Sequence, residues 1–113
     1  MIGNIEAVEL YKIAFSVELG YNVKNSDGTY PHAEIVLNHQ TIVSLSESNG
    51  WSDSSLNMQF CVNFGKGNKM ALSTTYEVLK DSGQIHSALG PCDWNESMTD
   101  LSDKFGVRWY LAV

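Results

Sequence analysis

The sequence predicts a single α+β domain, residues 1–113, made of two related halves. Three observations carry this prediction. The length of 113 residues suits one domain. Helical spacing of apolar residues occurs twice, and short alternating segments follow each helical stretch. The first half, about residues 1–48, has the order helix, strand, strand, strand. The second half, about 56–113, begins with an extra strand, so two βαβββ-type halves are expected, the first lacking its opening strand.

The first half opens with a helix from Asn4, which is the predicted N-cap because its side chain can accept a bond from the first turn. One helix face is apolar, with Ala7, Val8, Tyr11, Ala14 and Phe15. Residues 18–24 predict a short strand. Residues 32–38 and 41–47 alternate between apolar and polar side chains, which predicts a hairpin.

The second half opens with an alternating strand at residues 57–63. A turn ending at Asn68, a second predicted N-cap, leads into an amphipathic helix over residues 69–82. Gly83 follows this helix and is expected to end it as a C′ glycine. Three further strands are expected at 84–89, 96–102 and 107–113.

Alternation also assigns the two faces of each sheet. The apolar face should pack beneath the helices, where each buried side chain contributes about 1.5–3 kcal/mol; it comprises Ala33, Ile35, Leu37, Val43, Leu45, Met58, Phe60, Val62, Trp109 and Leu111. The opposite face is polar and is the candidate ligand-binding surface, because such surfaces orient small ligands. It comprises His32, Glu34, Ser44, Asn57, Gln59, Cys61, Arg108 and Tyr110, joined by His86 and Trp94.

Charge and composition exclude several classes of function. The net charge is −6, with six lysines and the single arginine Arg108, so no basic stripe exists to bind nucleic acid. No apolar run is long enough to span a bilayer, and no signal peptide is recognised at the N-terminus, so a cytoplasmic location is expected. Cys61 and Cys92 lack C-x-x-C spacing and are expected to be free thiols.

Several segments resemble PhnB-like proteins of the vicinal-oxygen-chelate (glyoxalase/bleomycin-resistance/dioxygenase) superfamily. Residues 4–15 (NIEAVELYKIAF) resemble the first helix of these proteins, and residues 31–45 resemble their His-Ala hairpin. The C-terminal stretch 83–111 contains the most distinctive element, DKFGVRW, and Trp94 stands where the family usually has a tryptophan. Asp93 departs from the pattern by replacing an aromatic residue. The resemblance covers nearly the whole chain and implies curved mixed sheets around a cavity, with helices on the outer faces.

The resemblance also bears on metal binding. Glyoxalase-type members bind a metal through a His on the first strand and a Glu on the last strand of each half. The three of these positions that remain here fall on Ser44, Asn57 and Tyr110, which are poor ligands for zinc, nickel or iron. Glyoxalase I activity, a metal and a cofactor are therefore not expected. A different metal site, made by His32, Glu34 and His86, is the alternative.

Three functions stay open at the level of the sequence. The first is binding of a small organic ligand, with Trp94 stacking on it and Arg108 pairing with a carboxylate or phosphate. For Trp94 the alternative is packing in the core, and for Arg108 it is a surface salt bridge. The second function is that of a metal-assisted enzyme, and the third is an interaction module with a vestigial cavity. A homodimer is expected, because the missing strand would leave an open sheet edge.

Overall fold

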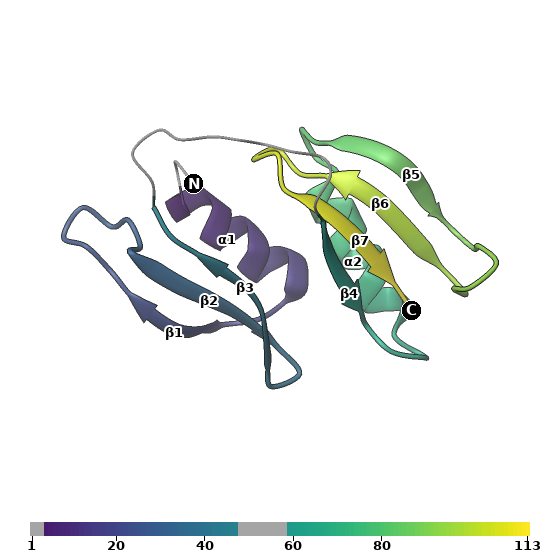
Figure 1. Cartoon of the computed structure of the whole chain (residues 1–113), viewed down its shortest axis with the longest axis horizontal. Coiled ribbons are helices and arrows are strands. Elements are labelled where there is room, and N and C mark those ends of the chain that lie inside the picture. Colours follow the sequence, from purple (N-terminus) through teal and green to yellow (C-terminus); the bar gives the residue numbers. More distant parts are fainter. Residues whose placement is uncertain (1–3, 48–58) are drawn as a thin grey trace. The chain divides into compact units, whose positions relative to one another are not determined.

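The computed structural model describes residues 4–47 and 59–113, and the chain divides into two compact units, Met1–Asp53 and Ser54–Val113. The first unit contains α1 (Asn4–Phe15) and the strands β1 (Leu19–Val23), β2 (His32–Leu37) and β3 (Gln40–Leu45). The second contains β4 (Phe60–Asn63), α2 (Lys69–Leu79), β5 (Gln84–Gly90), β6 (Met98–Ser102) and β7 (Arg108–Ala112). Each helix packs against the sheet of its own unit (Figure 1).

The predicted α+β class and order of elements are confirmed in both units. In each, a helix precedes three antiparallel strands, in the spatial orders β1-β2-β3 and β7-β6-β5. The second unit adds β4 parallel to β7, and α2 supplies the crossover that separates β4 from the later strands. The prediction of mixed sheets is right for the second unit only. The first sheet is antiparallel throughout, because the described residues of that unit include no counterpart of β4.

The apolar faces predicted from alternation form most of the core. Ala33, Ile35, Trp109 and Leu111 are fully buried, and Val43, Leu45 and Val62 are nearly so. The prediction was wrong for Phe60, which is 42% exposed although its ring lies 5.3 Å from that of Trp109. Leu37 is only half-buried; it ends β2 at the hairpin, beyond a register shift between Ile35 and Val36. Met58 lies outside the described residues.

A buried asparagine joins the helix of the first unit to its sheet. The Asn4 amide donates to the carbonyl oxygen of Tyr30 at 2.7 Å and accepts from the Tyr30 N–H at 3.1 Å. The Asn4 N–H donates to the Glu47 carboxylate at 3.2 Å. Asn4 is fully buried, so its side chain satisfies the backbone of a distant segment and not the first turn of α1. The predicted N-cap role of Asn4 was therefore wrong.

A buried carboxylate closes the turn between β6 and β7. Asp103 accepts from the N–H groups of Phe105 and Val107 at 2.9 and 3.1 Å through one oxygen. Its other oxygen accepts from the indole N–H of Trp109 at 3.0 Å. Gly106 completes the turn with a φ of 83°, and its N–H donates to the Asp103 carbonyl. The segment DKFGVRW is thus a turn built around one carboxylate that also orients a core tryptophan.

Both ends of α2 differ from the prediction in detail. Asn68 occupies the N-cap position, but its side chain donates to the Phe64 carbonyl oxygen at 2.6 Å instead of capping the helix. The residue with left-handed backbone after the helix is Ser82, with a φ of 58°, and not Gly83. Gly83 is needed for space, because a Cβ there would collide with the carbonyl oxygens of Ser102 and Leu79. Neither helix in the described residues is long and apolar enough to cross a membrane.

Replacing Asn4 with alanine should lower the free energy of unfolding by about 1–3 kcal/mol, because the buried N–H and carbonyl of Tyr30 lose their partner. Urea denaturation followed by circular dichroism measures this loss. Asn25→Ala is the matched control, because the Asn25 side chain donates to Thr29 at the surface. This substitution should lower the free energy of unfolding by only about a few tenths of a kcal/mol. Equal losses in the two variants would contradict the role assigned to Asn4.

Candidate functional site

The predicted site residues belong to both units. His32, Glu34 and Ser44 lie on β2 and β3 of the first unit. The second unit carries the rest that the structure describes: Gln59, Cys61, His86, Trp94, Arg108 and Tyr110. Asn57 lies outside the described residues. Each unit therefore presents its own group of polar side chains.

In the first unit, one carboxylate collects two hydrogen bonds. His32 and Glu34 lie on the same face of β2, and their Nε2 and Oε2 atoms are 2.7 Å apart. The Thr41 hydroxyl donates to the other Glu34 oxygen at 3.1 Å. The bond with His32, followed by the bond from Thr41, lowers the pKa of Glu34 below its ordinary value. Ser44 is the cross-strand neighbour of Glu34 and is exposed.

The pair of His32 and Glu34 offers two potential metal ligands. A catalytic zinc site takes three protein ligands and a structural site takes four. Within residues 4–47 and 59–113, no three His, Cys, Asp or Glu side chains gather closely enough to hold a metal ion. The third residue of the alternative site, His86, is on β5 of the other unit, where its Nε2 lies 2.8 Å from the Ser102 hydroxyl. The observed arrangement is a hydrogen-bonded His–Glu pair.

In the second unit, Arg108 is bound by a carboxylate of the neighbouring strand. Its Nε and Nη2 contact the two oxygens of Asp100 at 3.0 and 2.7 Å, a bidentate pair. The two side chains are 26% and 15% exposed. The bond to Asp100 raises the pKa of Arg108 further. The salt-bridge alternative for Arg108 is confirmed, and an anionic ligand would have to compete with Asp100 for the guanidinium.

Trp94 is held in place by a chain of hydrogen bonds while most of its surface faces solvent. Its indole N–H donates to the Tyr110 hydroxyl at 2.9 Å, and that hydroxyl donates to Asn95 Oδ1 at 2.7 Å. The Asn95 amide also donates to the Val113 carbonyl at 3.3 Å. Trp94 is 75% exposed, so the alternative of core packing was wrong for this residue.

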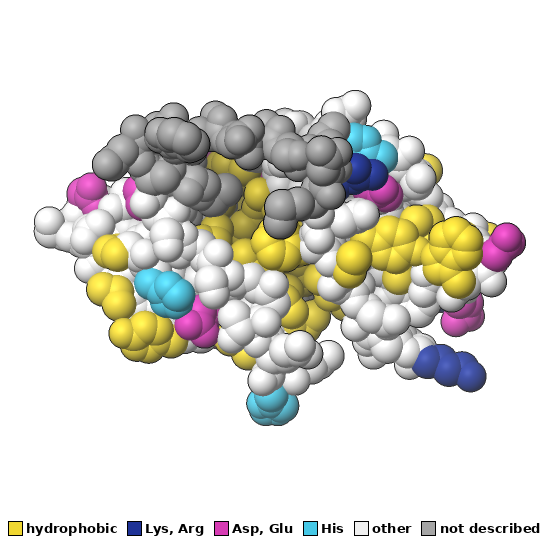
Figure 2. All heavy atoms as spheres, viewed as in Figure 1, with side chains coloured by type: hydrophobic (Ala, Val, Ile, Leu, Met, Phe, Trp, Pro, Cys, Tyr) yellow, Lys and Arg dark blue, Asp and Glu magenta, His cyan; other side chains and the backbone are white. Residues whose placement is uncertain are grey.

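Both cysteines border Tyr110. Cys61 is the residue of β4 directly beside Tyr110 on β7, and Cys92 lies 3.9 Å from the Asn95 oxygen that binds the Tyr110 hydroxyl. Both thiols are free. Burial raises the pKa of Tyr110, and the hydrogen bond from Trp94 acts in the opposite direction. Figure 2 shows hydrophobic side chains gathered over β6 and β7, next to a cluster of histidine, basic and acidic side chains.

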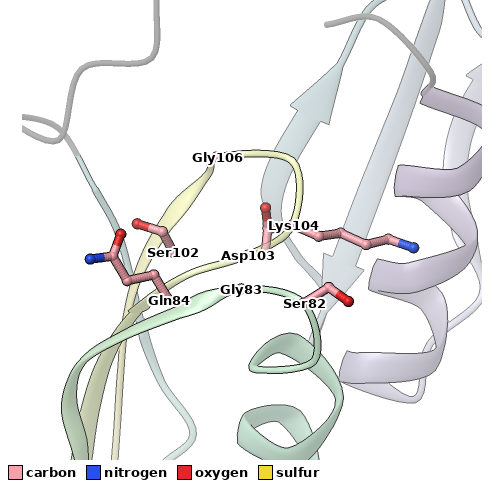
Figure 3. Close-up of a pocket in the computed structure, with 7 residues that line it drawn as sticks. All are labelled: Ser82, Gly83, Gln84, Ser102, Asp103, Lys104 and Gly106. Carbon is pink, nitrogen blue, oxygen red and sulfur yellow. The ribbon is translucent and has the colours of Figure 1, made fainter.

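A hollow of about 460 Å³ lies where α2 ends and the β6–β7 turn begins. Figure 3 shows the residues that line it: Ser82, Gly83, Gln84, Ser102, Asp103, Lys104 and Gly106. Ser102 is only 6% exposed, and its hydroxyl is the partner of His86. None of the residues that line the hollow was predicted as a site residue; only His86, the partner of Ser102, was. Alternation along residues 96–102 places Ser102 on the same polar face of the strand as Asp100, and this pattern could have marked Ser102 as a candidate site residue.

Comparison with solved structures places this fold among known proteins. No protein-family model and no curated protein matches the chain. Among solved structures, the chain is similar to a PhnB protein from Bacillus cereus, provisionally named a 3-demethylubiquinone-9 3-methyltransferase. The two share 23% identity over 98% of this chain and 91% of that one, with a TM-score of 0.75.

Two further solved structures have the same fold. Protein PA1353 from Pseudomonas aeruginosa has a TM-score of 0.71 and 19% identity, over 95% of this chain and 86% of that one. TioX from Micromonospora sp. ML1 has a TM-score of 0.63 and 15% identity, over 94% and 83%. At these identities the likeness shows a PhnB-like fold and no specific activity.

His32→Ala should raise the pKa of Glu34 toward its ordinary value, because the larger of the two hydrogen bonds to the carboxylate is lost. Thr41→Val should raise it less. A folded-state pKa below the unfolded value means that Glu34 stabilises the fold above the unfolded pKa and loses this contribution as pH falls through the folded pKa. NMR titration of the Glu34 carboxyl carbon measures the shift, with the exposed His39→Ala as control. An unchanged Glu34 pKa in His32→Ala would disprove the assignment.

Proposed function

We propose that the chain is a small-molecule-binding protein of the PhnB-like family, and that Trp94 is the platform on which its ligand lies. The observation that carries the proposal is an indole that is 75% exposed yet fixed by its own N–H. The PhnB-like fold of the structural neighbours is consistent with the family assignment. The hydrogen bonds that fix the indole support the proposal that a ligand stacks on it.

Because the N–H of the Trp94 indole is already hydrogen-bonded, the two faces of its ring are the part that can bind a ligand. Its N–H is engaged by Tyr110, whose hydroxyl is held in turn by Asn95. Asn95 also joins the end of the chain through Val113 and accepts from the Cys92 N–H. A ring fixed in this way loses little conformational entropy when a flat molecule stacks on it. Stacking and cation–π attraction are the interactions such a ring offers.

The charges of this unit favour a neutral or cationic ligand. The positive charge of Arg108 is balanced by Asp100. Asp93, next to Trp94 in the sequence, is exposed, whereas the nearby Glu96 carboxylate pairs with the Lys69 ammonium at 3.3 Å. A cation is attracted by the Asp93 carboxylate and by the indole face, whereas the same groups repel a carboxylate or phosphate.

Binding can be followed on the indole N–H signals of the three tryptophans, using N-methylquinolinium, 2-naphthalenemethanol and 2-naphthoate as probes. The cation should shift the Trp94 signal most and the anion least. Trp94→Ala should weaken binding of the cation by about 0.5–1 kcal/mol, the value of an exposed cation–π contact. Tyr21→Ala, which removes a 68% exposed aromatic ring from the first unit, should leave binding unchanged. Equal binding by Trp94→Ala and the unaltered chain would refute the platform.

We also propose that two copies of the chain associate through β3. In the part of the chain that the structure describes, β3 pairs on one side only, with β2, whereas its counterpart β7 carries β4 on the other side. An edge strand of this kind presents unpaired backbone groups that a second copy can bind. The proposed pair of chains would satisfy those groups in place of a strand like β4.

Sedimentation analysis at micromolar concentration should therefore give twice the chain mass of 12.5 kDa. Ile42→Lys, on β3, should shift the equilibrium toward the monomer, because an edge lysine opposes strand pairing. Ile13→Lys, on α1 where the side chain is 62% exposed, should not. A monomer for the unaltered chain would exclude the dimer, and a dimer abolished only by Ile13→Lys would place the contact on the helix.

A further inference from the structure

We propose that Ser102 and His86 form a nucleophile and general-base pair that cleaves small polar esters. This function goes beyond ligand binding at Trp94 and rests on different residues. It is carried by a hydrogen bond between the two side chains, by the hollow that Ser102 lines, and by an amide beside the serine. Because Trp94 takes no part, one proposal can fail while the other stands.

The distance between the two side chains suits proton transfer. His86 Nε2 lies 2.8 Å from Ser102 Oγ, within the range of about 2.6–3.2 Å expected for a nucleophile and its base. His86 is on β5 and Ser102 is on β6, and the two strands are paired neighbours. Ser102 pairs with Gln84, and His86 lies at the register shift between Ile85 and Ser87, so an irregularity within the sheet, and not a loop, brings the two groups together.

The hollow gives a substrate access to Ser102. Although Ser102 is only 6% exposed, it is one of the residues that line the space of about 460 Å³. That volume is in the range of small-molecule sites, about 300–1,000 Å³. The described lining residues carry hydroxyl, amide, carboxylate and ammonium groups and no aliphatic or aromatic side chain. The matching substrate is an ester with a short, polar acyl group.

Gln84 is placed to stabilise the negative charge that develops during attack. It is the direct cross-strand partner of Ser102, so the two side chains leave the sheet on the same face, about 4.5–5.5 Å apart at Cβ. Figure 3 shows both on the same side of the hollow. A side-chain amide N–H can donate to the oxygen of a tetrahedral intermediate, as donors of an oxyanion hole do.

The proposed reaction is hydrolysis in two steps. Ser102 Oγ attacks the carbonyl carbon of the ester while His86 Nε2 takes the hydroxyl proton. The C–O bond to the leaving alcohol then breaks, and His86 returns the proton to that oxygen, leaving an acyl group on Ser102. A water molecule attacks the acyl carbon while His86 takes its proton; the bond to Ser102 Oγ then breaks, His86 returns the proton to Oγ, and a carboxylic acid and the free serine result.

Diisopropyl fluorophosphate tests the nucleophile directly, because an activated serine displaces fluoride and keeps the phosphoryl group. Mass spectrometry of the full chain should show one adduct, and peptide mapping should place it on Ser102. Ser102→Ala should abolish the adduct. Ser87→Ala, which changes an exposed serine on β5, should leave it unchanged. Absence of an adduct on the unaltered chain, or an adduct elsewhere that survives in Ser102→Ala, would overturn the proposal.

Two further variants keep Ser102 in place and test its activation. His86→Asn should slow the hydrolysis of p-nitrophenyl acetate by about 100-fold or more, the usual contribution of a general base. Gln84→Leu should slow it by about 100-fold, as loss of an oxyanion donor does. His39→Asn, at an exposed hairpin position, is the control and should retain the full rate. Thermal unfolding checks that each variant is folded, and unchanged rates in folded His86→Asn and Gln84→Leu would disprove the mechanism.

Discussion

The hydrogen bonds of the buried Asp103 carboxylate are the interactions on which the second unit most depends. It binds two backbone N–H groups of its own turn and the indole of Trp109, so it fixes where β7 begins. From that point the side chains of β7 alternate between the two faces of the sheet. Trp109 and Leu111 face the core, while Arg108 and Tyr110 lie on the other face. A shift of one residue in this turn would exchange the two sets. The positions of Arg108 and Tyr110 therefore depend on the turn that the Asp103 carboxylate closes.

Local patterns were enough to predict the elements and most of the buried faces. Ala33 and Ile35 are buried as the alternation of β2 predicts, and both helices begin within one residue of their expected starts. These features depend on neighbours along the chain, which periodicity reports. Phe60 shows the limit of the method, because it has the right parity for burial but is 42% exposed. Its exposure depends on how far the core extends beneath an edge strand, which no local pattern records.

Contacts between distant residues were the part that the sequence could not supply. Asn4 has the residue type of an N-cap, yet it serves the backbone of a segment 26 residues away. The partner of Arg108 was one of thirteen acidic residues, and only the pairing of β6 with β7 selects Asp100. His86 was recognised as a candidate, but Ser102, 16 residues later, became its partner through the register of β5 and β6. Strand register, set by turns and bulges, decides these contacts.

The parallel pairing of β4 with β7 has a consequence for synthesis of the chain. Phe60 pairs with Trp109 and Asn63 pairs with Ala112, in each case 49 residues further along the chain. During translation β4 leaves the ribosome long before its partner exists, and its edge stays unpaired until β7 emerges. The contacts described for the first unit, by contrast, can all form once Glu47 has emerged. The position of β7 in the sequence therefore determines that the first unit can complete its contacts before the second.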